Sequence, residues 1–72
     1  MPKSVFENAV RRFLIGLGKN GSLPTQETAK GEFYAKGHGY EFVGNARGFS
    51  VRMPYDRVKG RTWVQVPIGG VV

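Results

Sequence analysis

The chain is short, basic and free of cysteine. It has 72 residues, and 11 lysines and arginines against 5 aspartates and glutamates give a formal net charge of +6. A chain of this length buries only about 60% of its unfolded surface, so it forms one small core and leaves no room for a separate catalytic domain. Without cysteine it has neither a disulfide framework nor a thiolate metal site.

These properties predict one domain over residues 1–72. The absence of cysteine is consistent with a cytoplasmic protein. A small body with this charge attracts nucleic acid or the acidic surface of a large protein or ribonucleoprotein complex. The apolar run FLIGL near the N-terminus is shorter than the apolar region of a signal peptide, and no run is long enough to cross a bilayer. We therefore expect no membrane partner.

The first predicted element is an amphipathic helix over residues 5–17. One face collects the apolar residues that recur at helical spacing, namely Phe6, Ala9, Val10, Phe13, Leu14 and Leu17. Ser4 and Glu7 have the spacing of a capping box, in which each side chain satisfies a backbone donor at the helix start. Gly18 is placed to end the helix in the left-handed conformation.

The next segment, residues 19–30, shows no periodic apolar pattern and is predicted to be a connector. After it the apolar period changes to two, and glycine-rich turns separate four predicted strands at residues 32–36, 40–43, 49–53 and 61–66. Residues 68–72 are expected to form a flexible tail. The fold class is therefore α+β, with the N-terminal amphipathic helix packed on a three- to four-stranded antiparallel β-meander.

Alternation along the strands divides this sheet into two faces. The side predicted to meet the helix holds Phe33, Ala35, Tyr40, Phe42, Phe49, Val51, Met53, Val64 and Val66. The opposite side holds Tyr34, Lys36, Ser50, Arg52, Arg61, Trp63 and Gln65. Exposed aromatic rings stack on unpaired bases and nearby cations hold phosphates, so this second face predicts binding of single-stranded RNA or DNA. A shift of one residue in the last strand would instead bury Trp63, and the sequence leaves both arrangements open.

Residues 47–51 read Arg-Gly-Phe-Ser-Val. They resemble the first five positions of the RNP1 motif of RNA-recognition modules and the equivalent strand of cold-shock domains. The resemblance covers these five residues and implies a strand that stacks bases. A turn at Arg47-Gly48 that leads into an ordinary amphipathic strand accounts for the same residues.

The loop before the last strand carries a second group of cations around a single acid, Asp56. A projecting loop of this kind can grip phosphate or insert into an acidic groove on a protein. Together with the sheet face, it gives the candidate contact residues Tyr34, Lys36, Arg47, Arg52, Tyr55, Arg57, Lys59, Arg61 and Trp63.

Nothing in the sequence is arranged for catalysis. His38 is the only histidine, and it lies between two glycines in a predicted turn, where a flexible Gly-His-Gly segment offers little to orient it as a general base. The chain has no metal-ligand quartet, phosphate-binding loop or nucleophile elbow. We therefore expect a non-enzymatic binding module with no catalytic residue, cofactor, metal or small-molecule substrate.

Three functions fit these residues. The first is a small basic nucleic-acid-binding module in gene expression that binds single-stranded RNA or DNA, for example in transcription regulation. The second is a small regulator, such as a phage-encoded inhibitor, that docks by protein contacts on RNA polymerase or the ribosome. The third is a small structural subunit of a larger assembly. Tyrosine and arginine serve the first two equally well, because they are enriched at protein hot spots and also contact nucleic acid.

Overall fold

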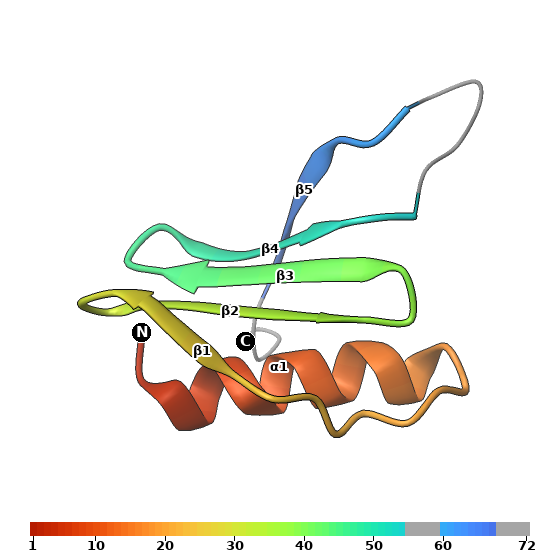
Figure 1. Ribbon diagram of the computed structural model, residues 1–72, viewed down its shortest axis with the longest axis horizontal. Coiled ribbons are helices and arrows are strands. Elements are labelled where there is room, and N and C mark those ends of the chain that lie inside the picture. The colour runs from red at the N-terminus through yellow and green to blue at the C-terminus, as the bar shows by residue number, and fades with distance from the viewer. Residues whose placement is uncertain (55–59, 68–72) are drawn as a thin grey trace.

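The computed structural model describes residues 1–54 and 60–67 (Figure 1). It consists of a helix followed by five strands, namely α1 (Lys3–Gly16), β1 (Gln26–Ala29), β2 (Glu32–Gly37), β3 (Tyr40–Asn45), β4 (Gly48–Arg52) and β5 (Trp63–Val66). The strands form one antiparallel sheet in the order β1-β2-β3-β4-β5, so each strand pairs with its neighbour in the chain. The α+β class and the antiparallel meander are confirmed, with five strands instead of three or four.

The additional strand is β1, which lies within the segment predicted to be a connector. All four of its side chains are exposed, so no apolar alternation marks it in the sequence. It is defined by backbone pairing with β2, in which Gln26 lies opposite Tyr34 and Glu27 opposite Phe33. Gly31, with a φ of 75°, supplies the left-handed residue in the tight turn between the two strands.

The start of α1 differs from the prediction. The helix begins at Lys3 with Pro2 as its N-cap, and the Pro2 carbonyl accepts hydrogen bonds from the amides of Val5 (3.1 Å) and Phe6 (3.2 Å). Ser4 therefore lies inside the first turn, and no side chain of the described residues caps the helix. The predicted Ser4–Glu7 capping box is wrong because Pro2, two residues before Ser4, already has the extended backbone of an N-cap.

The end of α1 agrees with the prediction. Gly18 has a φ of 76°, and its amide donates to the Ile15 carbonyl at 2.9 Å. The Lys19 amide donates to the Leu14 carbonyl, also at 2.9 Å. This pair of bonds is a Schellman motif, which needs a residue with positive φ directly after the helix.

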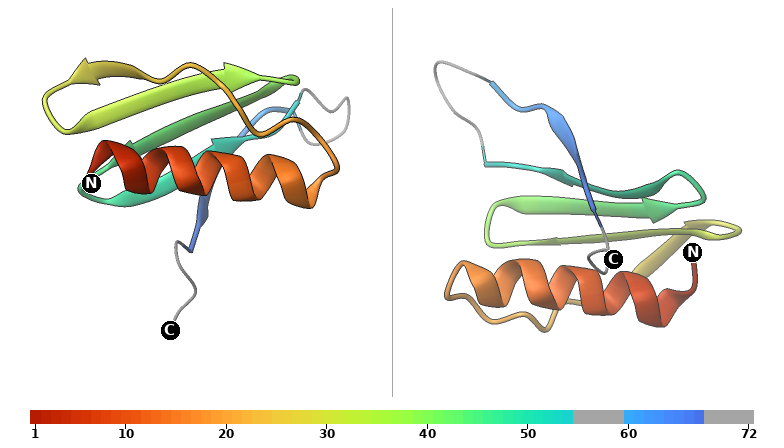
Figure 2. Two further views of the ribbon diagram at one scale, coloured as in Figure 1. Left: turned by 90° about the horizontal axis from the view of Figure 1, so that it is seen from below. Right: turned by 180° about the vertical axis from the view of Figure 1, so that it is seen from behind.

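The core lies between α1 and one face of the sheet (Figure 2). Its buried side chains are Phe6, Val10 and Leu14 from the helix and Phe33, Ala35, Phe42, Phe49 and Val51 from the strands. Gly44 in β3 lies directly beneath the Phe6 ring, since a Cβ added there would come within 2.4 Å of Phe6 Cδ1. Met53 and Val64 were predicted to be buried but are 37% and 46% exposed, because the end of β4 and the edge strand β5 extend beyond the area that α1 covers.

Candidate nucleic-acid interface

The sheet face opposite α1 carries a row of charged and aromatic side chains. The strand register places Lys36 opposite Glu41, Glu41 opposite Arg52, and Arg52 opposite Trp63. Directly opposite residues in antiparallel strands have Cβ atoms about 5 Å apart. These four side chains therefore form a continuous line across β2, β3, β4 and β5.

The register depends on the hairpin between β2 and β3. Its two turn residues, His38 and Gly39, both have positive φ, 55° and 83°, as a two-residue hairpin turn requires. The turn pairs Gly37 with Tyr40, and this pairing brings Lys36 and Glu41 together. The His38 ring contacts the Asn20 carbonyl oxygen at 3.1 Å, and this contact joins the turn to the segment after α1.

Glu41 is the centre of the row. Its Oε1 accepts hydrogen bonds from Arg52 and from Nη2 of Arg61 (2.9 Å), and its Oε2 accepts one from the Tyr34 hydroxyl (2.6 Å). The bond from Tyr34, supported by Arg52 and by the positive charge of Arg61, lowers the pKa of Glu41 although burial acts in the opposite direction. The same hydrogen bond to Glu41 raises the pKa of Tyr34. At neutral pH the network therefore joins an ionised carboxylate to a protonated phenol.

The two arginines are held close together by this one carboxylate. Nε of Arg61 also donates to the Met53 carbonyl oxygen (3.3 Å), and the Arg52 guanidinium lies 5.0 Å from the centre of the Trp63 ring, within the range of a cation–π contact. The side chains of Arg52 and Arg61 remain 32% and 36% exposed, whereas that of Glu41 is 11% exposed. The cluster formed by Tyr34, Glu41, Arg52, Arg61 and Trp63, here called the arginine cluster, therefore presents two oriented guanidinium groups and one net positive charge to solvent.

The structure brings four of the candidate residues together, namely Tyr34, Arg52, Arg61 and Trp63. Lys36 is exposed and continues the same row on β2. Arg47 lies apart, in the turn before β4, at a distance of about 16–17 Å along the strand from Arg52 at about 3.3 Å per residue. The remaining candidates, Tyr55, Arg57 and Lys59, lie outside the described residues.

The RNP1-like residues enter an ordinary strand of the core. Phe49 is 1% exposed and packs against Phe6 and Phe42, with ring centres 5.8 and 5.9 Å away. The Arg47 amide donates to the Asn45 side chain (2.9 Å), and the Arg47 carbonyl accepts from the Gln65 side chain (2.8 Å). Residues 47–51 thus form a turn and a strand whose aromatic ring faces the helix.

Sequence reasoning missed Glu41 as a member of the site. The predicted sheet face did not include it, although the alternation that turns Phe42 inward also turns Glu41 outward. Two turns could have revealed it: the two-residue turn at His38-Gly39 places Lys36 opposite Glu41, and the turn at Ala46-Arg47 places Arg52 on its other side.

A scan against protein-family models gave no match, and searches of curated proteins and of solved structures found no similar chain. In the part of the chain that the structure describes, no helix is both long and apolar enough to cross a membrane. Residues 1–54 and 60–67 also bring together no group of three or more histidine, aspartate or glutamate side chains that could hold a metal ion.

Proposed function

We propose that this protein binds single-stranded RNA or DNA on the sheet face opposite α1, as a non-enzymatic module in gene expression. The observation that supports this most directly is the exposed Trp63 ring beside the paired guanidinium groups of Arg52 and Arg61. An unpaired base can stack on the indole, which contributes about 1–3 kcal/mol per base, while the guanidinium groups bind phosphate oxygens. A duplex offers no such base, because its bases already stack on one another.

Glu41 prepares this surface for an anionic ligand. Ordering a long side chain at an interface costs about 0.5–1.5 kcal/mol. The hydrogen bonds from Arg52 and Arg61 to Glu41 already restrict both arginines in the free protein, so a phosphate that approaches them loses less of its binding energy to ordering. Glu41 itself acts as a positioning residue, because its own oxygens are occupied by these contacts and by Tyr34.

The cations set the expected salt dependence. Each phosphate contact on a single strand contributes about −0.7 to the slope of log affinity against log salt concentration. Lys36, Arg52 and Arg61 on the sheet face therefore give a slope of about −2. If the strand also extends to Arg47 at the far end of β4, the slope becomes about −3.

The proposal is tested by titrating the fluorescence of Trp63, the only tryptophan, with single-stranded oligonucleotides at low and moderate salt. We expect quenching, and an affinity that falls with salt along the slope given above. Arg61→Gln should make the slope shallower by about 0.7. Arg12→Gln, which removes the same charge from the opposite side of the protein, should leave the slope unchanged. Absence of quenching at low salt, in a sample whose circular dichroism shows it to be folded, would overturn the proposal.

A second candidate function is a small regulator that docks by protein contacts. The observation that favours it is an apolar groove between α1 and β5, on a different surface from the arginine cluster.

A further inference from the structure

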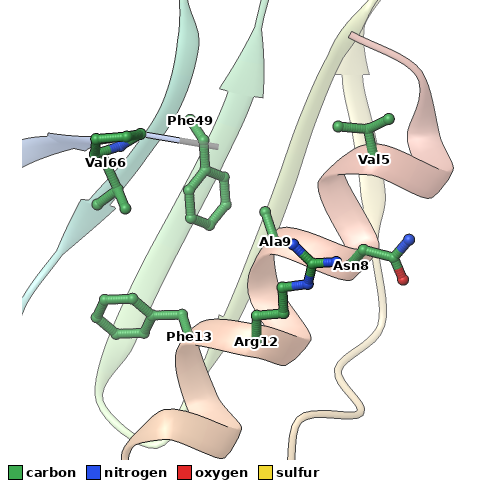
Figure 3. A pocket seen from close by; sticks show the side chains of 8 residues that line it. Val5, Asn8, Ala9, Arg12, Phe13, Phe49 and Val66 are labelled. Carbon is green, nitrogen blue, oxygen red and sulfur yellow. The ribbon is translucent and has the colours of Figure 1, made fainter. Parts of the chain in front are cut away.

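The groove between α1 and the β4–β5 edge is apolar and open (Figure 3). Ala9 and Phe13 of the helix form one wall, Val66 forms the other, and the Phe49 ring forms the floor. The groove encloses about 410 Å³, and among the described residues that line it Arg12 is the only charged one. Its ligand should therefore offer apolar side chains, with negative charge in their vicinity.

The strand beside this groove is an unprotected sheet edge. Among the described residues β5 pairs only with β4, so half of its backbone N–H and C=O groups point away from the sheet. Native proteins commonly protect such an edge with charged side chains, but the sequence of β5, Trp-Val-Gln-Val, contains none. Trp63 and Val64 are 44% and 46% exposed, one on each face of the sheet.

We infer that β5 accepts an extended segment of an acidic partner protein as a sixth strand. Main-chain hydrogen bonds to the free edge of β5 would hold such a segment, and alternate side chains would point to opposite faces of the sheet. One set would lie beside Val64 and Val66, toward the groove and Arg12. The other set would lie beside Trp63, with Arg52 one strand further in. A segment that alternates apolar and acidic residues fits both faces, with its apolar side chains toward the groove and its acidic side chains toward the arginine cluster.

Charge favours an acidic partner over a second copy of this chain. Each copy carries a formal net charge of +6, and pairing of two β5 edges would bring two arginine clusters onto one continuous sheet face. Like charges placed in this way oppose association. A segment with glutamate or aspartate at alternate positions instead supplies counter-charge to the arginines.

The inference is independent of the proposed nucleic-acid binding, although the two ligands would meet at Trp63 and the arginine cluster. A short synthetic peptide of alternating valine and glutamate, labelled with fluorescein, is a suitable probe. We expect it to bind with a rise in anisotropy and with NMR shifts at the β5 amides. The same peptide with N-methyl groups on alternate backbone nitrogens, prepared in both registers, should lose binding in at least one register, because strand addition requires those N–H groups.

A matched pair of protein variants separates the arginine cluster from the general charge. Arg61→Gln removes one positive charge from the face that the glutamates would meet, and it should weaken binding of the acidic peptide about two- to fivefold. Arg11→Gln makes the same charge change, but Arg11 packs beside Gly21 on another side of the helix, so it should have a much smaller effect. Both side chains are exposed, so both variants should fold.

Several outcomes would overturn the inference. They are no binding of the acidic peptide by the folded protein, equal binding of a peptide with lysine in place of glutamate, and indifference to N-methylation in both registers. A dimer in sedimentation experiments with shifted β5 amides would assign the edge to a second copy instead. Binding of single-stranded oligonucleotides together with failure of the peptide would overturn this inference alone and leave the proposed function intact.

Discussion

Replacing Glu41 by glutamine removes the charge that holds Arg52 and Arg61 together while keeping the shape of the side chain. In the native chain Oε1 accepts from both arginines and Oε2 accepts from Tyr34. After Glu41→Gln the amide oxygen can still face the arginines, and the amide N–H can donate to the Tyr34 hydroxyl oxygen. The stability that is lost therefore reports the charge of the carboxylate.

The expected loss is about 1–2 kcal/mol of unfolding free energy. A hydrogen bond to a charged group contributes about 1.5–3 kcal/mol and a neutral one about 0.5–1.5 kcal/mol, so each arginine contact should weaken by about 1 kcal/mol. The side chains of Arg52 and Arg61 are 32% and 36% exposed, so water replaces part of that loss and about 2 kcal/mol is an upper bound. In a domain of this size the loss lowers Tm by about 5–15 °C.

Thermal unfolding followed by far-UV circular dichroism, at pH 7 and at falling pH, measures this effect. The pKa of Glu41 is lowered by folding, so its stabilisation is present above the pKa of an unfolded glutamate, about 4.3, and is lost as the pH falls through the folded value. The difference in Tm between the native protein and Glu41→Gln should therefore be full at pH 7 and should shrink below about pH 4. Glu27→Gln removes the same charge from the exposed strand β1 and should change stability by less than about 0.5 kcal/mol.

Two results would refute this reasoning. Equal Tm values for the native protein and Glu41→Gln at pH 7 would mean that the carboxylate does not stabilise the fold. A difference that stayed constant down to low pH would mean that the shape of the side chain is responsible, and not its charge.

Three further predictions follow from the contacts of Glu41 and from the packing of two glycines. Tyr34→Phe should remove the part of the absorbance change at 295 nm that titrates above pH 10, because the hydrogen bond to Glu41 raises the pKa of the Tyr34 phenol. The stability that this bond contributes is full below the unfolded pKa of about 10 and is lost as the pH rises through the folded value. Loss of a component that titrates at the ordinary pKa of a tyrosine, about 10, would contradict the bond. Gly44→Ala should destabilise the fold by about 1–3 kcal/mol in urea unfolding, because the new Cβ would lie 2.4 Å from the Phe6 ring. Gly16→Ala points into open space and should stabilise α1 by up to about 1 kcal/mol, so a shift of both glycine variants in one direction would contradict the packing. Glu41→Gln should also bind single-stranded oligonucleotides more weakly than the native protein, because Arg52 and Arg61 are then held less firmly. Tighter binding would show that the negative charge of Glu41 repels the ligand more than its positioning of the arginines helps.

The parts of the fold that could be predicted are those with an apolar repeat. Phe6, Val10 and Leu14 recur at helical spacing, and Phe49 and Val51 alternate along β4, so α1 and the central strands can be read from the sequence. Strand β1 could not, because backbone pairing alone defines it and its four side chains are all exposed. The helix start was misplaced because the spacing of Ser4 and Glu7 indicates an N-cap at Ser4, whereas the structure has its N-cap at Pro2.

Part of the candidate site could also be predicted from the alternation of residues along the strands. Alternation places Tyr34 and Arg52 on one face without any structure, whereas the face of Trp63 depends on the register of the last strand. Glu41, which accepts hydrogen bonds from Tyr34 and Arg52, is placed beside them by the registers of the β2–β3 and β3–β4 hairpins, and a register follows only when the turn length is known. The groove could not be predicted, because it depends on how far α1 covers the sheet and on where β5 lies relative to the helix.

The neighbour-to-neighbour order of the sheet makes most of the folding of this chain local. Each hairpin closes a short loop, and such local closures are fast. The exception is α1, because its Phe6 packs against Phe49 of β4, which comes much later in the chain. During synthesis α1 would leave the ribosome before β4, and its apolar face would stay uncovered until β4 follows. A newly made chain is therefore most prone to aggregation in the interval before β4 emerges, and a chaperone that binds short apolar helices would protect it at that stage.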